Sequence, residues 1–293
     1  MIPLPLGMQT VKIARSMNLS ITAGFHMQAE NLTCHLKLNK VDLVNKAVYK
    51  LIYNNLYQYV DGIHYPTQFI QNIFENNIKQ KTNGYVISNG VHSYVQKRNI
   101  SKPDELKDKI VILSIGRFSR EKCQDTLIKS IYHSKYKDKI QLILGGQGAK
   151  EKAYKKMSKK LPIPPIMKLF DREEIINVIN YSDIYAHPAE VELEGIACLE
   201  AITCGKLTIV SDSKLSATKD FAIDNKCIFK NRNSKDLAKV IDYWIEHREE
   251  KNEYENKYLN NTISYKQDEC MQKMEDMIIE IYNKKESLVD SKL

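Results

Sequence analysis

The chain has 293 residues, 43% of them hydrophobic, with 44 lysines and arginines against 36 aspartates and glutamates, which gives a formal net charge of +8. This length suits two domains of ordinary size, each with its own core. No apolar run approaches the length that spans a bilayer, and the N-terminus lacks the pattern of a signal peptide. The mild positive charge favours phosphates, acidic lipid headgroups or nucleic acid as partners, and charge alone does not choose among them.

The cysteines argue against a zinc site or a disulfide framework, because no two of them have Cys-x-x-Cys spacing. Three of them also fall in apparent helices, so we expect reduced thiols, as in a cytosolic protein. The six are Cys34, Cys123, Cys198, Cys204, Cys227 and Cys270.

The first 92 residues show a loose alternation of helices and strands. We expect helices at 7–18 and 39–59, a short helix after residue 66, and strands at 20–26, 61–66 and 84–90. Three parallel strands make a poor free-standing domain, and the pattern opens on a helix. We therefore expect a partial N-terminal domain, 1–92, whose front is absent. The polar segment 93–107, with Pro103, is expected to be the interdomain linker.

The alternation is regular in the next part, 108–263, which we expect to be a second domain. Expected strands are 110–118, 139–146, 163–170, 183–188, 207–212 and 227–229. Expected helices are 120–134, 150–161, one capped by Asp171 with Glu174 as capping-box partner, 195–204, and one capped by Ser234. The strands are apolar on both faces, which predicts an α/β fold with a parallel sheet covered on both sides. Such sheets bind ligands where strands end and helices begin. An amphipathic helix, 264–282, follows, and the tail beyond it looks frayed.

The segment "AEVELEGIACLEAI" (189–202) carries the first candidate site. A helix that begins at Gly195 directs free N–H groups and its positive dipole end at the preceding loop, which suits a diphosphate. Glu192 before the helix and Glu200 inside it can accept hydrogen bonds from hydroxyl groups. This combination fits a sugar nucleotide. A charged loop whose carboxylates merely satisfy the helix dipole is an equally good interpretation of this stretch alone.

Two cations follow the strand before Gly116. Arg117 and Lys122 are expected at its carboxyl end, where they can neutralise a diphosphate. A purely structural role is less favoured, because a cation at a helix start opposes the dipole.

Weaker signals lie elsewhere. Gly146, in "GGQG", could let a ligand approach the backbone, or it could belong to an ordinary turn. His26 closes a strand and could face a ligand, although a lone histidine is more often structural. The other histidines are read as structural, with His187 noted only as lying near the site. We interpret the lysine run in 150–160 as a solvated helix. A patch that binds anionic lipid is the less favoured alternative.

Taken in order, these segments resemble the retaining family 4 glycosyltransferases of the GT-B fold. The resemblance runs along almost the whole chain. "VISNGV" resembles the end of that family's first domain, "IGRFSREK" its Gly-Arg…Glu-Lys segment, and "EVELEGIACLEAITCG" its two glutamates separated by seven residues. "NLSITAGFH" resembles a first-domain strand that ends in a functional histidine. The fold implied is α/β with two Rossmann-like domains, the N-terminal one incomplete.

The resemblance also implies roles. Arg117 and Lys122 would hold the donor diphosphate, Glu200 the ribose and Glu192 the donor sugar. The donor-binding backbone would comprise Gly116, Gly146, Gly195, Ile196 and Ala197. His26 would reach the donor from the first domain, and the terminal segment 264–293 would return to that domain. No metal or other cofactor would be needed, the donor would be UDP- or GDP-linked, and the anomeric configuration would be retained.

Three features depart from the family pattern. The strands and glycine-rich loop that normally begin the N-terminal domain are expected to be absent. Glu194 stands where an aromatic residue is common, which changes the sugar pocket. Phe170 and Asp171 stand where a glycine is common, which puts the nucleobase contacts in doubt.

The expected activity is transfer of a sugar from a nucleotide donor, a UDP-sugar first, to a cell-envelope lipid or polysaccharide. The chain would be cytoplasmic, with peripheral contact at the inner face of the membrane as one option. A first rival is a truncated or half-enzyme chain that binds donor but needs a partner chain to complete its N-terminal domain, or that is non-catalytic. A second is a sugar-nucleotide epimerase, which would turn over donor without acceptor. Nucleic-acid binding ranks last, because no aromatics interleave with a basic face.

Overall fold

The computed structural model describes residues 5–36, 38, 41–260 and 265–290. The chain forms two compact units, residues 1–90 with 267–293 and residues 91–266. The segment expected to be a linker, 93–107, belongs to the second unit: Val95 and Leu106 are buried in that unit's core. A few apolar side chains thus anchor a stretch whose overall polarity suggested a free connection.

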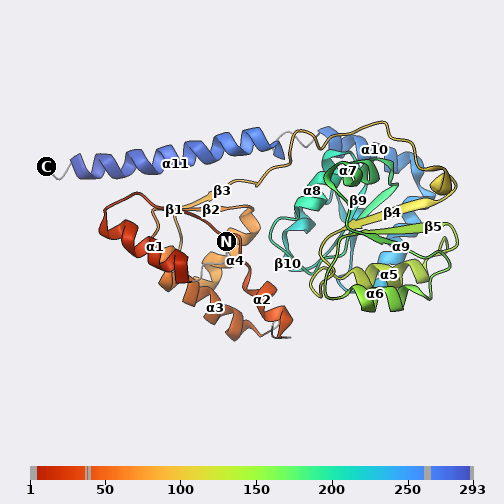
Figure 1. Ribbon diagram of the computed structural model, residues 1–293, viewed down its shortest axis with the longest axis horizontal. Coiled ribbons are helices and arrows are strands. Elements are labelled where there is room, and N and C mark those ends of the chain that lie inside the picture. The colour runs from red at the N-terminus through yellow and green to blue at the C-terminus, as the bar shows by residue number, and fades with distance from the viewer. Residues whose placement is uncertain (1–4, 37, 39–40, 261–264, 291–293) are drawn as a thin grey trace. The chain divides into compact units, whose positions relative to one another are not determined.

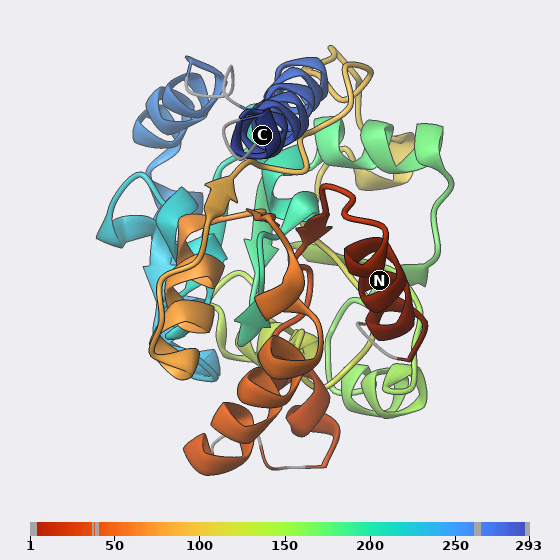
Figure 2. The same ribbon diagram turned by 90° about the vertical axis from the view of Figure 1, so that its left-hand side faces the viewer.

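The first unit is built on a three-stranded parallel sheet in the order β1-β2-β3. Its strands are β1 (Thr22–Gly24), β2 (Gly62–Tyr65) and β3 (Gly84–Val86). Its helices are α1 (Pro5–Ser16), α2 (Ala29–His35), α3 (Asp42–Asn55), α4 (Gln68–Ile78) and α11 (Gln267–Asp290). Figure 2, which looks along α11, shows this helix on one side of the strands and α3 and α4 on the other.

Aromatic side chains form much of the core of the first unit. Phe25, directly after β1, has its ring centroid 4.2 Å from that of Phe74 on α4 and 5.1 Å from that of Tyr57. On the opposite face, Ile281 of α11 lies against Gly62 at the start of β2, where a Cβ would come within 2.1 Å of the isoleucine side chain. The sheet is therefore covered on both faces by elements of its own unit.

The second unit contains a six-stranded parallel sheet in the order β11-β9-β7-β4-β5-β6. Its strands are β4 (Ile110–Ile115), β5 (Ile140–Gly145), β6 (Ile166–Lys168), β7 (Ile184–His187), β9 (Thr208–Ser211) and β11 (Ile228–Phe229). The strand order reverses between β4 and β7. At such a switch point the loops on the two sides diverge and open a crevice at the carboxyl edge of the sheet.

Helices cover both faces of this sheet (Figure 1). One face carries α5 (Gln124–His133), α6 (Glu151–Ser158) and α9 (Ser234–Glu246), and the other carries α7 (Arg172–Tyr181), α8 (Ile196–Thr203) and α10 (Arg248–Asn260). Strands β5, β7 and β9 are buried along their whole length, as their continuous apolar runs predict, whereas the edge strand β6 is largely exposed. The α/β prediction for this unit is confirmed.

Several element predictions need correction. The helix expected at 39–59 begins at Asp42 and ends at Asn55, and residues 39–40 lie outside the described residues. The helix α9 is capped by Asn233, whose side chain accepts a hydrogen bond from the amide of Asp236, and Ser234 is its first helical residue. Cys123 precedes α5 in a left-handed conformation, and Cys204 follows the last residue of α8, so neither lies inside a helix as expected.

Among the other element predictions, one helix cap is confirmed, two helices were missed, and one helix is longer than expected. The capping box of Asp171 and Glu174 at α7 is present, as predicted. The prediction missed α2 and α10, and α11 continues to Asp290 through residues expected to fray. Within the described residues, none of the helices combines the length and apolarity needed to cross a membrane.

Candidate functional site

The predicted donor-site residues of the second unit converge at the carboxyl edge of its sheet. Gly116 and Arg117 follow β4, Gly146 follows β5, and His187 ends β7. Because β4 lies between β5 and β7, these three strand ends are adjacent. The convergence places the candidate site at the switch point of the sheet.

The loops after β4 and β5 are joined through their backbones. The amide of Gly116 donates to the carbonyl of Gly145, and that of Phe118 donates to the carbonyl of Gln147, both at 2.9 Å. A Cβ on Gly146 would lie 2.2 Å from the carbonyl oxygen of Gly116, so only glycine allows this approach. Gly146 thus sets the shape of the loop that carries Arg117.

Glu192 lies at the centre of a buried polar network. Its carboxylate pairs with the Lys122 ammonium and lies 3.1 Å from Nε2 of His187, whose Nδ1 is 3.2 Å from the Tyr185 hydroxyl. Burial alone would raise the pKa of Glu192, but the Lys122 charge and the hydrogen bond to His187 outweigh it and lower the pKa to about 2. Glu192 is therefore held as an anion at any physiological pH.

Short backbone segments fix Glu192 in place. Strand β8 (Val191–Glu192) pairs in parallel with β10 (Leu215–Ser216) in a two-stranded sheet. The preceding residue, Glu190, is buried and accepts a 2.6 Å ion pair from Arg232. Its amide donates to the carbonyl of Glu121 at 2.8 Å, which ties the Glu192 loop to the loop of Lys122.

Helix α8 begins beside this network. Gly195 has a φ of 86°, a left-handed conformation that favours glycine, and a Cβ there would lie 2.4 Å from Cγ2 of Thr218. The first backbone bonds of the helix run from the amides of Cys198 and Leu199 to the carbonyl of Gly195. Ile196 and Ala197 thus supply the preceding N–H groups, which helix geometry directs toward the loop.

Glu200 projects from the second turn of α8 and is half-buried, and its burial raises its pKa above the usual range. Glu194, just before Gly195, is buried. Arg117 differs from these residues because its side chain is exposed, and no ion pair joins it to an acidic group within the described part of the chain. It is thus a cation available at the edge of the site.

His26 belongs to the first unit. It follows β1, is exposed, and has its ring centroid 5.2 Å from that of His64. Partial desolvation of its ring and the neighbouring His64 charge lower its pKa. Its role toward a donor stays a prediction.

Sequence reasoning missed two contributors to the site. His187 was read as structural, yet its ring contacts Glu192. Thr218 packs against Gly195, and no motif near Thr218 in the sequence indicates a site. For His187 a signal existed, because a histidine at the end of a buried strand, five residues before the first glutamate of the motif, lies on the same sheet edge.

Comparison with known protein families gives one match. Residues 95–261 match the model of the family described as glycosyl transferases group 1. The chain belongs to this family. It is a glycosyltransferase, and the matched segment contains the whole site of the second unit described above.

Comparison with solved structures agrees. The chain is similar to the catalytic domain of cholesterol-alpha-glucosyltransferase from Helicobacter pylori, with 38% identity and a TM-score of 0.50, over 53% of this chain and 99% of that one. It is also similar to HepE of Anabaena (14% identity, TM-score 0.71, 97% of this chain and 76% of that one) and to sucrose-phosphate synthase of Thermosynechococcus elongatus (14%, 0.74, 94% and 71%). The latter two likenesses show the fold, which is GT-B. A search of curated proteins found no match.

Proposed function

We propose that this glycosyltransferase transfers glucose from UDP-glucose to a lipid acceptor with retention of the anomeric configuration. The observation that carries the donor half is the Lys122–Glu192–His187 network beside the start of α8, with Arg117 exposed at its edge. Two cations, a helix N-terminus and two carboxylates at one sheet edge suit a diphosphate flanked by two sugars.

Two similar proteins support the choice of substrates. The Helicobacter pylori protein is described as a cholesterol-alpha-glucosyltransferase, and HepE of Anabaena was crystallised with UDP and glucose and with UDP-glucose. The first shares 38% of its residues with this chain. We therefore propose a lipid as the acceptor, with a polysaccharide as the alternative.

The proposed roles follow from the charges. Arg117 and Lys122 neutralise the diphosphate as its bond to the anomeric carbon breaks, and the amides of Ile196 and Ala197 hold phosphate oxygens. Glu200 accepts hydrogen bonds from the ribose hydroxyls, and Glu192 from the donor sugar. The acceptor hydroxyl forms the new bond on the face that the diphosphate leaves and gives its proton to a departing phosphate oxygen. In this proposal the two cations take the place of a metal ion, and His26 reaches the donor from the first unit.

Calorimetric titration with UDP and with GDP tests the donor half. We expect UDP to bind the purified chain, and Glu200→Ala to weaken this binding at least about tenfold, because two charge-assisted hydrogen bonds are lost. Glu253→Ala, an exposed carboxylate on α10, is the matched control and should leave binding unchanged. A folded chain that binds neither nucleotide would sink the proposal.

A second assay tests the reaction. Radiolabelled UDP-glucose is incubated with and without a lipid extract, and label is followed into the organic phase. We expect label in the lipid only when both enzyme and extract are present. Conversion of the donor to another UDP-sugar without acceptor would instead indicate an epimerase.

A further inference from the structure

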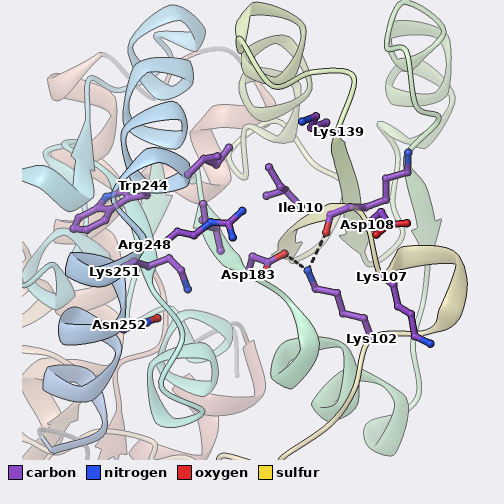
Figure 3. A pocket seen from close by; sticks show the side chains of 13 residues that line it. Lys102, Lys107, Asp108, Ile110, Lys139, Asp183, Trp244, Arg248, Lys251 and Asn252 are labelled. Carbon is purple, nitrogen blue, oxygen red and sulfur yellow. Dashed lines mark hydrogen bonds and ion pairs between the residues drawn. The ribbon is translucent and has the colours of Figure 1, made fainter.

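A cavity of about 440 Å³ opens at the opposite edge of the six-stranded sheet. Ile110 begins β4, Ile184 begins β7 and Lys139 precedes β5, so the cavity lies at the amino ends of the three central strands. The start of α10 and the end of α9 complete its wall (Figure 3). The volume falls within the usual range for small-ligand sites.

The lining is strongly basic. Six cationic and two acidic residues line this cavity, and three of the cations are paired with acidic side chains. The cations are Lys102, Lys107, Lys109, Lys139, Arg248 and Lys251. Like charges gathered this closely repel one another unless an anion joins them.

The acidic groups nearby are largely engaged. Lys102 pairs with Asp183 and also donates to the carbonyl of Lys109. Lys107 pairs with Asp104, and Lys251 pairs with Glu255 on its own helix at 2.7 Å. By contrast, no ion pair links Arg248, Lys109 or Lys139 to an acidic side chain in the residues for which coordinates are described. Figure 3 shows Arg248 extending from the start of α10 toward the centre of the hollow.

This cavity is separate from the donor site. The six residues of β4 lie between the two, which at about 3.3 Å per residue separates them by roughly 20 Å. None of the lining residues belongs to the donor motifs.

We propose that this cavity, which we call the amino-edge site, binds a small soluble anion carrying two or more phosphate groups. The planar guanidinium of Arg248 matches phosphate oxygens in pairs, and the surrounding ammonium groups supply further charge. A lipid headgroup offers the same chemistry. However, a membrane at this edge would face away from the carboxyl edge, where transfer to a lipid acceptor would take place. The proposal rests on the cavity alone and does not depend on the choice of donor or acceptor.

The test is calorimetric titration with inorganic pyrophosphate. The chain is first changed to Arg117→Ala/Lys122→Ala, so that pyrophosphate cannot be held by the donor-site cations. In this background, Arg248→Ala/Lys109→Ala removes two cations of the amino-edge site. Lys152→Ala/Lys239→Ala removes two exposed lysines of α6 and α9 and serves as the control with equal charge. Thermal melts check that every variant folds.

We expect pyrophosphate to bind the background chain and the control equally, and to bind the Arg248→Ala/Lys109→Ala chain at least about tenfold more weakly. Absence of binding to the folded background chain would overturn the proposal. Equal weakening in both double variants would also overturn it, since the attraction would then come from diffuse charge.

Co-sedimentation with phosphatidylglycerol vesicles separates the two sources of phosphate. We expect the amino-edge and control variants to sediment to the same extent. Loss of sedimentation in the Arg248→Ala/Lys109→Ala chain alone would overturn the proposal of a soluble ligand and assign the cavity to a membrane headgroup.

Discussion

The two edges of the six-stranded sheet differ in how their charged side chains are paired. At the carboxyl edge, two acids with largely buried side chains each have a cationic partner: Lys122 pairs with Glu192, and Arg232 pairs with Glu190. At the amino edge, cations outnumber acids, and Arg248 has no ion pair with the acidic groups described. Matched pairs hold side chains in one orientation, whereas an excess of charge attracts a ligand but orients it less.

A cation that is already paired with an acid attracts a bound anion less strongly than an unpaired cation does. A diphosphate at the carboxyl edge has to share Lys122 with Glu192, so part of the attraction is already used within the protein. Arg117, which is exposed and unshared, would contribute its charge without this loss. An anion at the amino edge would meet cations of both kinds, because Lys102 and Lys251 are paired with acids, whereas Arg248 has no such pair among the described residues.

Lys122→Ala should cause the largest loss. It removes a cation from the diphosphate and leaves Glu192 buried without its ammonium partner. We expect kcat/KM for sugar transfer to fall about 100-fold to 1,000-fold, the range for losing one preorganised charge partner. The measurement is the radiolabel transfer assay, with circular dichroism to confirm folding.

Lys239→Ala, an exposed lysine of α9, is the control for this change and should keep full activity. An active Lys122→Ala enzyme would remove Lys122 from the proposed site.

Glu192→Gln should destabilise the protein in a pH-dependent way. The pKa of Glu192 is lowered to about 2, below its usual 4.5, so its ionisation stabilises the folded chain above pH 4.5. This stability is lost as the pH falls from 4.5 toward 2, because the carboxyl group then becomes neutral like the amide. Near pH 7 we expect a difference in the free energy of unfolding on the order of 3 kcal/mol.

Urea unfolding at pH 7, 5 and 3.5 checks this prediction. The gap between wild type and Glu192→Gln should be similar at pH 7 and 5, where the unfolded chain is also mostly ionised at this position, and smaller at pH 3.5. A gap that stays constant down to pH 3.5 would contradict the lowered pKa.

Gly195→Ala should have an intermediate effect on both folding and donor binding. The left-handed φ of 86° and the 2.4 Å approach of a new Cβ to Thr218 would cost about 2 kcal/mol. Shifting the start of α8 would also move the amides of Ile196 and Ala197. We expect UDP affinity to fall about tenfold by calorimetry.

A second substitution sharpens this test. Thr218→Ser removes Cγ2, the atom that a Cβ at position 195 would strike. The double variant should recover part of the lost stability and keep the cost of the backbone conformation. No recovery would mean that Thr218 does not limit this position.

The sequence predicted that the candidate residues of the carboxyl edge follow strand ends, because these residues are local to motifs. Arg117 and Lys122 are five residues apart, and Glu192 and Glu200 share one loop and helix, so spacing alone places them after strands. The six-stranded sheet followed from apolar runs in the same way. The partner of Glu192 could not be predicted, because Lys122 is 70 residues away in sequence.

The cavity at the amino edge could not be predicted in this way. Its lining comes from 102–110, 139, 183–184 and 244–252, and α10, which carries Arg248, was not predicted at all. The helix has a strongly polar sequence with weak periodicity, and its burial rests on Tyr254 and Tyr258. The first unit posed the same difficulty, since α2 is only seven residues long and has no side-chain cap.

His187 offers the smallest and most specific test of the matched network. Its Nε2 lies 3.1 Å from Glu192, while Lys122 supplies the main charge, so we regard His187 as a positioning residue. His187→Phe keeps the buried ring and removes the hydrogen bond, and we expect kcat to fall about tenfold with KM for the donor nearly unchanged. His187→Gln, which can place an amide N–H near the same point, should restore most of kcat. If both variants lose kcat equally, or if KM rises instead, His187 supports the packing of β7 rather than the orientation of Glu192. If neither variant changes kcat, Lys122 and the pairing of β8 with β10 are enough to hold the carboxylate in place.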